Sequence, residues 1–285
     1  MLLLPNIVVN TLVLAAMYIL ASLGFAFIFN MLGTINLAHG AFYMMAAYIT
    51  YFLSSSAGLN SWIAMLLSAV IMAGVGLLME RICFRPFFTE FNRVVMISVA
   101  IMTMLQTAAT SISGSKTMSI DAFASGVTDF GIVTVSNEKL VTFAVGILLL
   151  AVTLLIVYRT KLGTEMEAVA QDRLGAALQG IPIHKVSALV CALGFALAAV
   201  AGSMMGAYQQ ISPYMGDNMN IRILMLVMLA GAGSMNGIIA TGAIMALLDA
   251  VCPIYFQSYT ASALACSVIV VLLLIRPKGF FGHEM

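Results

Sequence analysis

The chain has few charged residues. Only 8% of its 285 residues are Asp, Glu, Lys or Arg, whereas 62% are hydrophobic. Soluble domains carry roughly 25% charged residues, which they need to cover a surface that faces water. The composition therefore predicts an integral membrane protein. The net charge is only +1, and no basic stripe is present. This excludes nucleic-acid binding, because a phosphate backbone requires clustered Lys and Arg.

Cysteine clusters and catalytic constellations are also missing. Cys83, Cys191, Cys252 and Cys266 occur singly, with no C-x-x-C pair for redox or zinc chemistry. We interpret them as small core residues, and we expect no metal site. The pattern assembles no nucleophile with a base and an orienting residue, so an enzyme is the least favoured class.

Long apolar segments make up most of the chain. About 20 apolar residues are needed to cross a bilayer, and six segments reach this length clearly: 7–29, 33–56, 61–79, 94–112, 140–158 and 186–208. The C-terminal third is less regular and adds three predicted crossings, the first of them short or broken: 221–232, 235–252 and 256–275. The sequence thus predicts an all-α, polytopic membrane protein with eight to nine transmembrane segments in a single domain, residues 1–285.

The positively charged residues predict the orientation. Cytoplasmic loops carry the excess of Lys and Arg. With nine crossings, nine of the twelve basic residues fall on one side, in the segments 81–93, 159–185 and 276–278. We expect this side to be cytoplasmic, with the N-terminus outside and the C-terminus inside. The segment 113–139 is rich in Ser, Thr, Asp and Gly and is expected to be an external loop.

The predicted cytoplasmic loop, 159–185, contains a helix of another kind. Thr164 and Glu167 have the spacing of a capping box, in which a hydroxyl and a carboxylate satisfy free amides at a helix start. Gly180 and Pro182 supply the matching stop. The pattern predicts one helix of about 15 residues, roughly 22 Å long. It is too short and too polar to cross the membrane.

An apolar stripe runs along this predicted helix at helical spacing. The stripe is formed by Met166, Val169, Ala170, Leu174, Ala177 and Leu178, with Arg173 as the one intrusion, while Glu167, Gln171 and Asp172 lie off it. A helix that lies on lipid headgroups usually has a polar face rich in Lys and Arg. This helix is acidic at its start and nearly neutral overall. The pattern therefore favours docking to a protein partner over docking to lipid.

Polar residues also interrupt the apolar segment 33–56. The stretch "GTINLAHGAF" puts Asn36 and His39 three residues apart, and a polar side chain in lipid is costly unless it has partners. "GTIN" at 33–36 recurs as "GSMN" at 233–236, each after an apolar run and before another crossing. In transporters, paired segments interrupted by glycine can mark the substrate path.

Two interpretations of these polar segments stay open. In the first they line a substrate path, for which the candidate residues are Gly33, Asn36, His39, Gly40, Gly233, Ser234 and Asn236. In the second Asn36 and His39 form hydrogen bonds from helix to helix within the bundle.

Several motifs resemble one known family. "GTINLAHGAFYMMAAY", "ERICFRP", "AVAQDRLGAALQGI", "AAVAGSMMGAY", "GAGSMNGIIATG" and "RPKGFFG" occur in the order, and at about the spacings, found in the branched-chain amino acid ABC transporter permeases. The resemblance covers residues 23–282 and is closest to the first of the two permeases that such systems encode. Two positions depart from the family pattern: Glu167, where a basic residue is usual, and Ala230, where glycine is usual.

The resemblance implies a multi-pass permease of the bacterial inner membrane. Such a permease pairs with a second permease subunit, two cytoplasmic ATPase subunits and a periplasmic substrate-binding protein to import leucine, isoleucine, valine or related amino acids. The resemblance also implies that 164–180 is the coupling helix, which seats in a cleft of the ATPase. The candidate coupling residues are Thr164, Met166, Glu167, Val169, Asp172, Arg173, Leu174, Leu178 and Gly180.

The chain lacks an ATP-binding motif of its own. "SGSKT" at 113–117 imitates the end of a P-loop, but it has no upstream glycine, no adjacent Gly-Lys pair and no strand before it. ATP would therefore be hydrolysed on partner subunits, and we expect no cofactor bound by this chain.

Two other functions stay open. A permease for urea or short amides would share this architecture, because the separate binding protein largely selects the substrate. A secondary carrier driven by an ion gradient would need carboxylates inside the membrane or an equivalent ion site. Asp249 and Glu80 are the only acids close to the spans, and both lie near span ends. We interpret Asp249 as an interfacial residue.

Overall fold

The computed structural model describes residues 3–281, except positions 89, 115, 130, 132–133, 232–233 and 277–278. Long helices fill most of this range: α1 (Leu3–Leu32), α2 (His39–Ser55), α3 (Ser61–Met79), α4 (Phe91–Ser113), α5 (Asn137–Arg159), α8 (Ile183–Gln209), α9 (Met215–Ala230), α10 (Met235–Tyr255) and α11 (Ser258–Ile275). The short helices η1 (Glu80–Phe84) and η2 (Arg85–Phe87) follow α3. The helical, polytopic architecture predicted from the apolar segments is confirmed.

Six helical segments of the described chain are long and apolar enough to cross a membrane: Leu4–Leu32, Ser61–Phe87, Phe91–Ser113, Asn137–Arg159, Ile183–Gln209 and Met235–Tyr255. The other three predicted crossings correspond to helices outside this set. Helix α2 has 17 residues, α9 has 16, and the apolar run identified in α11 is Cys266–Ile275. Each apolar segment of the sequence therefore contains a helix, although residues 33–38 of the segment 33–56 are not helical.

Helices α1 and α8 form the centre of the bundle. Most of the apolar stretch of each is buried inside the protein, whereas α4 and α5 expose most of theirs. The two central helices touch through Gly24 and Gly194. A Cβ atom added to either glycine would lie 2.5 Å from the carbonyl oxygen of the other. Only glycine permits so close an approach of two backbones.

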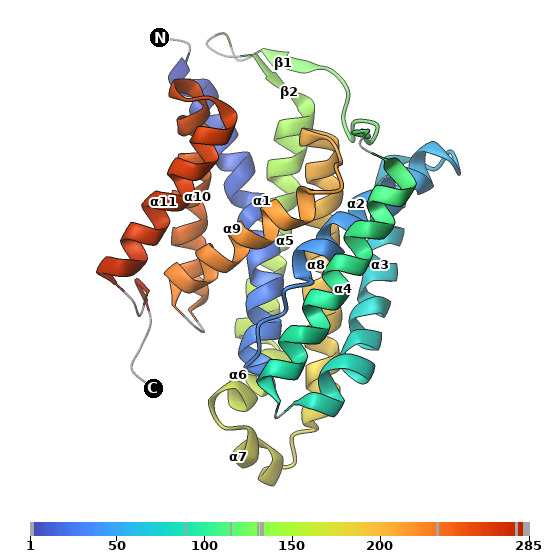
Figure 1. Ribbon diagram of the computed structural model, residues 1–285, viewed down its shortest axis with the longest axis vertical. Helices are drawn as coiled ribbons and strands as arrows, with labels where there is room; N and C mark the ends of the chain where they lie inside the picture. Colours follow the sequence, from blue (N-terminus) through green and yellow to red (C-terminus); the bar gives the residue numbers. More distant parts are fainter. Residues whose placement is uncertain are drawn as a thin grey trace.

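The two ends of the bundle differ in structure (Figure 1). The start of α1 lies at the same end as an antiparallel hairpin of β1 (Val127–Asp129) and β2 (Thr134–Ser136). Helices α6 (Lys161–Gln171) and α7 (Arg173–Leu178) lie at the opposite end. The two segments predicted to be loops on opposite sides, 113–139 and 159–185, are thus at opposite ends of the molecule.

The segment 159–185 differs from the single helix predicted for it, because it forms two helices. The Thr160 hydroxyl accepts a hydrogen bond from the Gly163 N–H (3.4 Å) and caps α6. The Asp172 carboxylate accepts one from the Leu174 N–H (3.0 Å) and caps α7. The predicted capping box is wrong, since Thr160 offers a hydroxyl one turn earlier and leaves Thr164 inside α6. The predicted stop agrees with the structure.

Candidate functional site

The chain between α1 and α2, residues 33–38, is not helical. Gly33 has φ +64°, and its N–H donates to the Phe29 carbonyl oxygen at 2.8 Å, which ends α1. The positive φ favours glycine at this position. In Figure 1 the segment leaves the lower end of α1 and runs back up to the start of α2, well inside the length of the bundle. The glycine and the following residues therefore interrupt the helical pattern within the length of the bundle.

The broken segment is held by two neighbouring helices. The Leu37 N–H donates to Oγ of Ser98 on α4 (3.1 Å), and the Leu37 carbonyl accepts from Nδ2 of Asn220 on α9 (2.9 Å). The next N–H, that of Ala38, donates to Oδ1 of Asn36 (3.1 Å). Irregular backbone inside a bilayer persists only where its polar groups have such partners. The Asn36 side chain thus stabilises the turn that precedes α2, whose N-cap residue is Ala38.

His39 lies in the core between α1, α2 and α8 and is fully buried. Its Nε2 is 3.2 Å from the carbonyl oxygen of Ala21 on α1, so this nitrogen carries the hydrogen and donates. The ring meets Phe25 and Phe195 edge to face, with centroids 5.7 and 5.9 Å away. The hydrogen bond from His39 on α2 to Ala21 on α1 joins two helices, as the second interpretation of this polar segment expects.

Gly40 brings α2 against α9. A Cβ atom on Gly40 would overlap the carbonyl oxygen of Gly216, and a Cβ on Gly216 would lie 2.7 Å from the carbonyl oxygen of Gly40. The two backbones are therefore in contact, and neither position has room for a side chain. This crossing positions Asn220, one turn further along α9, against the broken segment.

The second polar segment lies elsewhere. Gly233 falls outside the described residues. The Ser234 hydroxyl accepts from the Gly237 N–H (3.0 Å) and caps α10, and Asn236 is exposed in the first turn of that helix. Helix α10 packs against α1, α9 and α11, whereas α2 packs against α3, α4, α8 and α9. The helices that follow the two similar stretches therefore pack in different surroundings, with α9 as a shared neighbour.

The predicted apolar stripe of the cytoplasmic loop is divided between α6 and α7. Met166 and Val169 on α6 are only 8% and 4% exposed, and α6 packs against α1, α5 and α8. Leu174 and Leu178 on α7 are 73% and 82% exposed. The prediction of one continuous docking face is wrong, because the new helix start at Asp172 changes the direction of the chain.

The remaining polar residues of this region have separate roles. The Glu167 carboxylate accepts from Nε2 of Gln171 on the same helix (3.4 Å). The Arg173 guanidinium stacks on the Phe88 ring, with its central carbon 3.5 Å from the centroid. Burial lowers the pKa of this guanidinium, and the charge of Glu80 acts in the opposite direction. Arg173 thus attaches the start of α7 to Phe88, the residue that follows η2.

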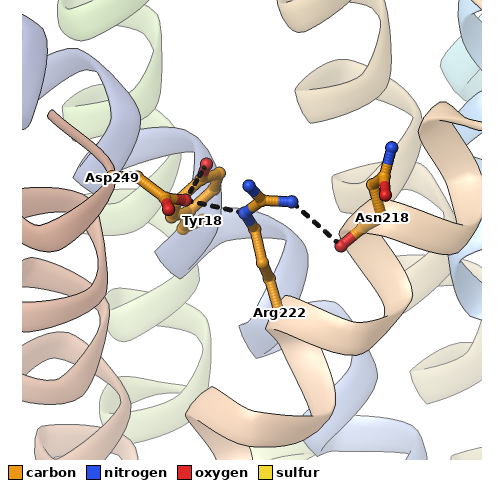
Figure 2. A network of polar contacts seen from close by, with 4 residues as sticks. All are labelled: Tyr18, Asn218, Arg222 and Asp249. Atoms are coloured by element: carbon orange, nitrogen blue, oxygen red, sulfur yellow. Dashed lines mark hydrogen bonds and ion pairs between the residues drawn. The ribbon is translucent and has the colours of Figure 1, made fainter. Parts of the chain in front are cut away.

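A cavity of about 570 Å³ is lined by residues of α1, α2, α8, α9, α10 and α11 and of the loop between α8 and α9. Its wall carries a charged network, shown in Figure 2. Nε of Arg222 on α9 lies 2.7 Å from Oδ2 of Asp249 on α10, and the Tyr18 hydroxyl on α1 donates to the same oxygen at 2.7 Å. Nη1 of Arg222 donates to the Asn218 carbonyl at 3.2 Å.

Sequence reasoning missed this network. It interpreted Asp249 as interfacial and placed Arg222 outside the predicted cytoplasmic side, whereas the two form an ion pair with side chains only 9% and 21% exposed. The available signal was one acid and one base, each near the end of an apolar run. Charges in such positions require partners, but Asp217 is closer to Arg222 in the sequence than Asp249 is, so only the structure identifies the pair.

A second cavity, of about 560 Å³, lies at the junction of η1 with the start of α8. Its lining includes Glu80, Arg81, Arg85, His184 and Lys185. The Glu80 side chain is buried. Among the described residues, no group of three or more His, Cys, Asp or Glu is placed to hold a metal ion.

Comparison with known proteins matches residues 7–275 to the family described as "Branched-chain amino acid transport system / permease component". The chain is 27% identical to the "High-affinity branched-chain amino acid transport system permease protein LivH" of Salmonella typhimurium and 29% identical to the corresponding protein BraD of Pseudomonas aeruginosa. Each alignment covers 96% of this chain and 94% of the relative.

A solved structure has a similar fold. It is PsaBC from Streptococcus pneumoniae in complex with Fab, which matches with a TM-score of 0.52 and 15% identity over 94% of this chain and 91% of that chain. At this identity the match concerns the arrangement of helices alone.

Proposed function

The chain belongs to the family of branched-chain amino acid transport permeases, and from this premise we propose that it forms half of the translocation path of an ATP-binding-cassette importer for branched-chain or related amino acids. The observation that carries the proposal is the extent of the family match, 7–275, which takes in nearly all of the helical bundle. The relatives named as high-affinity permeases align over almost their whole length.

The proposed importer contains other subunits. It has a second permease subunit, two cytoplasmic ATPase subunits and a periplasmic substrate-binding protein, as the family resemblance implies. The sequence supports a separate ATPase, because it lacks the P-loop that holds nucleotide phosphates. The complex lies in the bacterial inner membrane.

We propose nine crossings, with the N-terminus outside and the C-terminus cytoplasmic. The distribution of Lys and Arg supports this orientation. So does the position of α6 and α7 at one end of the bundle, opposite the start of α1. In this arrangement the broken segment 33–38 together with α2 makes one crossing, and α9 makes a short one.

The coupling contact with the ATPase is proposed to lie on α7. Leu174 and Leu178 are large apolar side chains exposed beyond the membrane-spanning helices. Burial of each in a protein groove is worth about 1.5 to 3 kcal/mol. In this proposal α6 supports α7, since Met166 and Val169 anchor it to the bundle.

The alternatives have weaker support. An ion-driven carrier needs a carboxylate whose charge can balance that of a bound cation. The charge of Asp249 is already neutralised by Arg222, so a cation bound alone would leave one charge uncompensated. A permease for urea or short amides keeps the same architecture, and no observation on this chain favours it over amino acids.

Reconstitution tests the proposed function. The complete complex in proteoliposomes is expected to take up leucine only when ATP and the substrate-binding protein are both supplied. Vesicles that contain this chain alone are expected to take up none. Leucine accumulation by the chain alone on an ion gradient would overturn the proposal.

A further inference from the structure

The Arg222–Asp249 pair joins two helices at a large cost in desolvation free energy. Removing two charges from water costs several kcal/mol for each ion, and apolar side chains of similar size often hold a structure as well or better. The pair nevertheless sits in the wall of a cavity of about 570 Å³, among apolar helices. Charged residues within membrane segments commonly mark substrate pathways.

Both members of the pair keep unused hydrogen-bonding capacity. The two bonds that the described residues make to the Asp249 carboxylate both fall on Oδ2. A carboxylate has two acceptor oxygens, so Oδ1 can accept more. Arg222 uses Nε and Nη1, and Figure 2 shows its other terminal nitrogen without a bond to the residues drawn. The network can therefore bind an additional donor and an additional acceptor.

The rest of the cavity lining combines apolar and polar residues. Leu14, Met205, Met215, Met219 and Ile221 supply the apolar part, and Gln209, Gln210 and Ser212 supply the polar part. Methionine side chains adapt to ligands of different shape. The volume falls within the range of about 300 to 1,000 Å³ that is typical of small-molecule sites.

We propose that this cavity is a subsite for a zwitterionic α-amino acid, in which Arg222 binds the carboxylate and Asp249 binds the ammonium group. The inference rests on the proposed function and specifies the substrate contacts. The Tyr18 hydroxyl holds the Asp249 carboxylate in place, and the methionine-rich wall receives the aliphatic side chain. Because the pair is neutral overall, a zwitterion leaves no charge uncompensated. An amine or a carboxylate alone would leave one.

A cysteine within the cavity provides a direct assay of binding. Cys266 on α11 lines the cavity, whereas Cys83 lies on η1 and is not among the residues that line it. In the complete complex, without binding protein, saturating leucine is expected to slow the modification of Cys266 by N-ethylmaleimide at least threefold. The rate at Cys83, followed by peptide mass spectrometry, is the internal reference and should not change. Isoamylamine and 4-methylpentanoate, which lack one charged group each, are expected to give no protection.

A double variant separates a substrate subsite from a structural contact. R222M/D249L removes both charges, so neither is left unpaired in the bundle. The variant complex is expected to assemble, and leucine is expected to give its Cys266 no protection from N-ethylmaleimide. Its leucine uptake should fall at least tenfold. E90Q/R93Q, which removes the exposed ion pair at the start of α4, is the matched control and should keep uptake.

The outcomes distinguish the two proposals. If the wild-type complex takes up leucine but leucine does not protect Cys266, the subsite inference is wrong and the proposed function stands. Normal uptake by R222M/D249L also overturns the inference and assigns the pair a structural role. If the wild-type complex itself takes up no leucine, the proposed function fails, and the inference fails with it. Should the double variant not assemble, the Cys266 protection measured on the wild type decides the inference alone.

Discussion

Glycine residues determine how closely the helices of this bundle approach one another. Gly24 with Gly194 and Gly40 with Gly216 form two places where backbones touch. Small residues have this role in membrane helices because apolar burial does not drive one helix against another in lipid, so packing contacts must do so. The two contacts join α1 to α8 and α2 to α9.

Replacement of Gly40 by alanine tests the contact between α2 and α9. The added methyl group would overlap the Gly216 carbonyl oxygen, and overpacking of this kind costs about 1 to 3 kcal/mol. The thermal unfolding midpoint of the purified complex is therefore expected to fall. Gly74→Ala is the control, because no atom lies within 4 Å of the Cβ position there. Equal midpoints for the two variants would contradict the close approach.

His39→Ala tests whether the imidazole holds the helices together. The change removes the hydrogen bond to Ala21 and leaves a hole between Phe25 and Phe195, for a combined cost of about 2 kcal/mol or more. The yield of assembled complex is expected to fall, while leucine uptake per assembled complex stays close to that of the wild type. Normal assembly with lost uptake would instead support a role in the substrate path.

A single change at the Arg222–Asp249 pair should destabilise the protein more than a change of both residues. Asp249→Asn leaves the Arg222 charge without its partner in a largely buried place, which costs about 3 to 5 kcal/mol. R222M/D249L leaves no such charge. The unfolding midpoint of the single variant is therefore expected to lie below that of the double variant. A double variant at least as unstable as the single one would show that the pair itself stabilises the bundle.

Helices α6 and α7 show how one segment is divided between two roles. α6 is part of the folded bundle, and α7 presents its apolar residues outward. The change occurs at Asp172, whose carboxylate caps the second helix. A change on α6 therefore alters the folding of this chain, and a change on the exposed side of α7 alters its surface.

Substitutions on the two helices should separate coupling from stability. L174D/L178D changes exposed positions, so the permease is expected to keep its unfolding midpoint but to lose ATPase subunits during purification. Val169→Asp buries a carboxylate in the bundle and should lower the midpoint. If L174D/L178D retains the ATPase subunits and full stimulation of hydrolysis by the binding protein, α7 is not the coupling element.

The helices of this protein could be predicted from sequence because a run of apolar residues long enough to cross a bilayer is a local property. The start of α6 could not, since Thr160 and Thr164 are chemically equivalent caps and the choice depends on packing of Met166 and Val169 against α1, α5 and α8. The pairing of Arg222 with Asp249 also depends on the fold, because the two residues lie on different helices. Asn36 and His39 were identified as unusual, but their partners, Ala38 for Asn36 and Ala21 for His39, follow only from the structure.

The chain after α1 returns through an irregular segment and a shorter helix. Thirty residues of α helix extend about 45 Å, which exceeds the roughly 30 Å hydrocarbon layer, whereas the 17 residues of α2 extend only about 25 Å. The six residues 33–38 add less than the roughly 20 Å that they would span when extended, because the His39 N–H donates back to the Asn36 carbonyl oxygen at 3.3 Å. Their number therefore determines where α2 begins relative to α9. Deletion of one residue between Gly33 and Ala38 would displace α2 by up to about 3.3 Å along its path and move Gly40 out of register with Gly216.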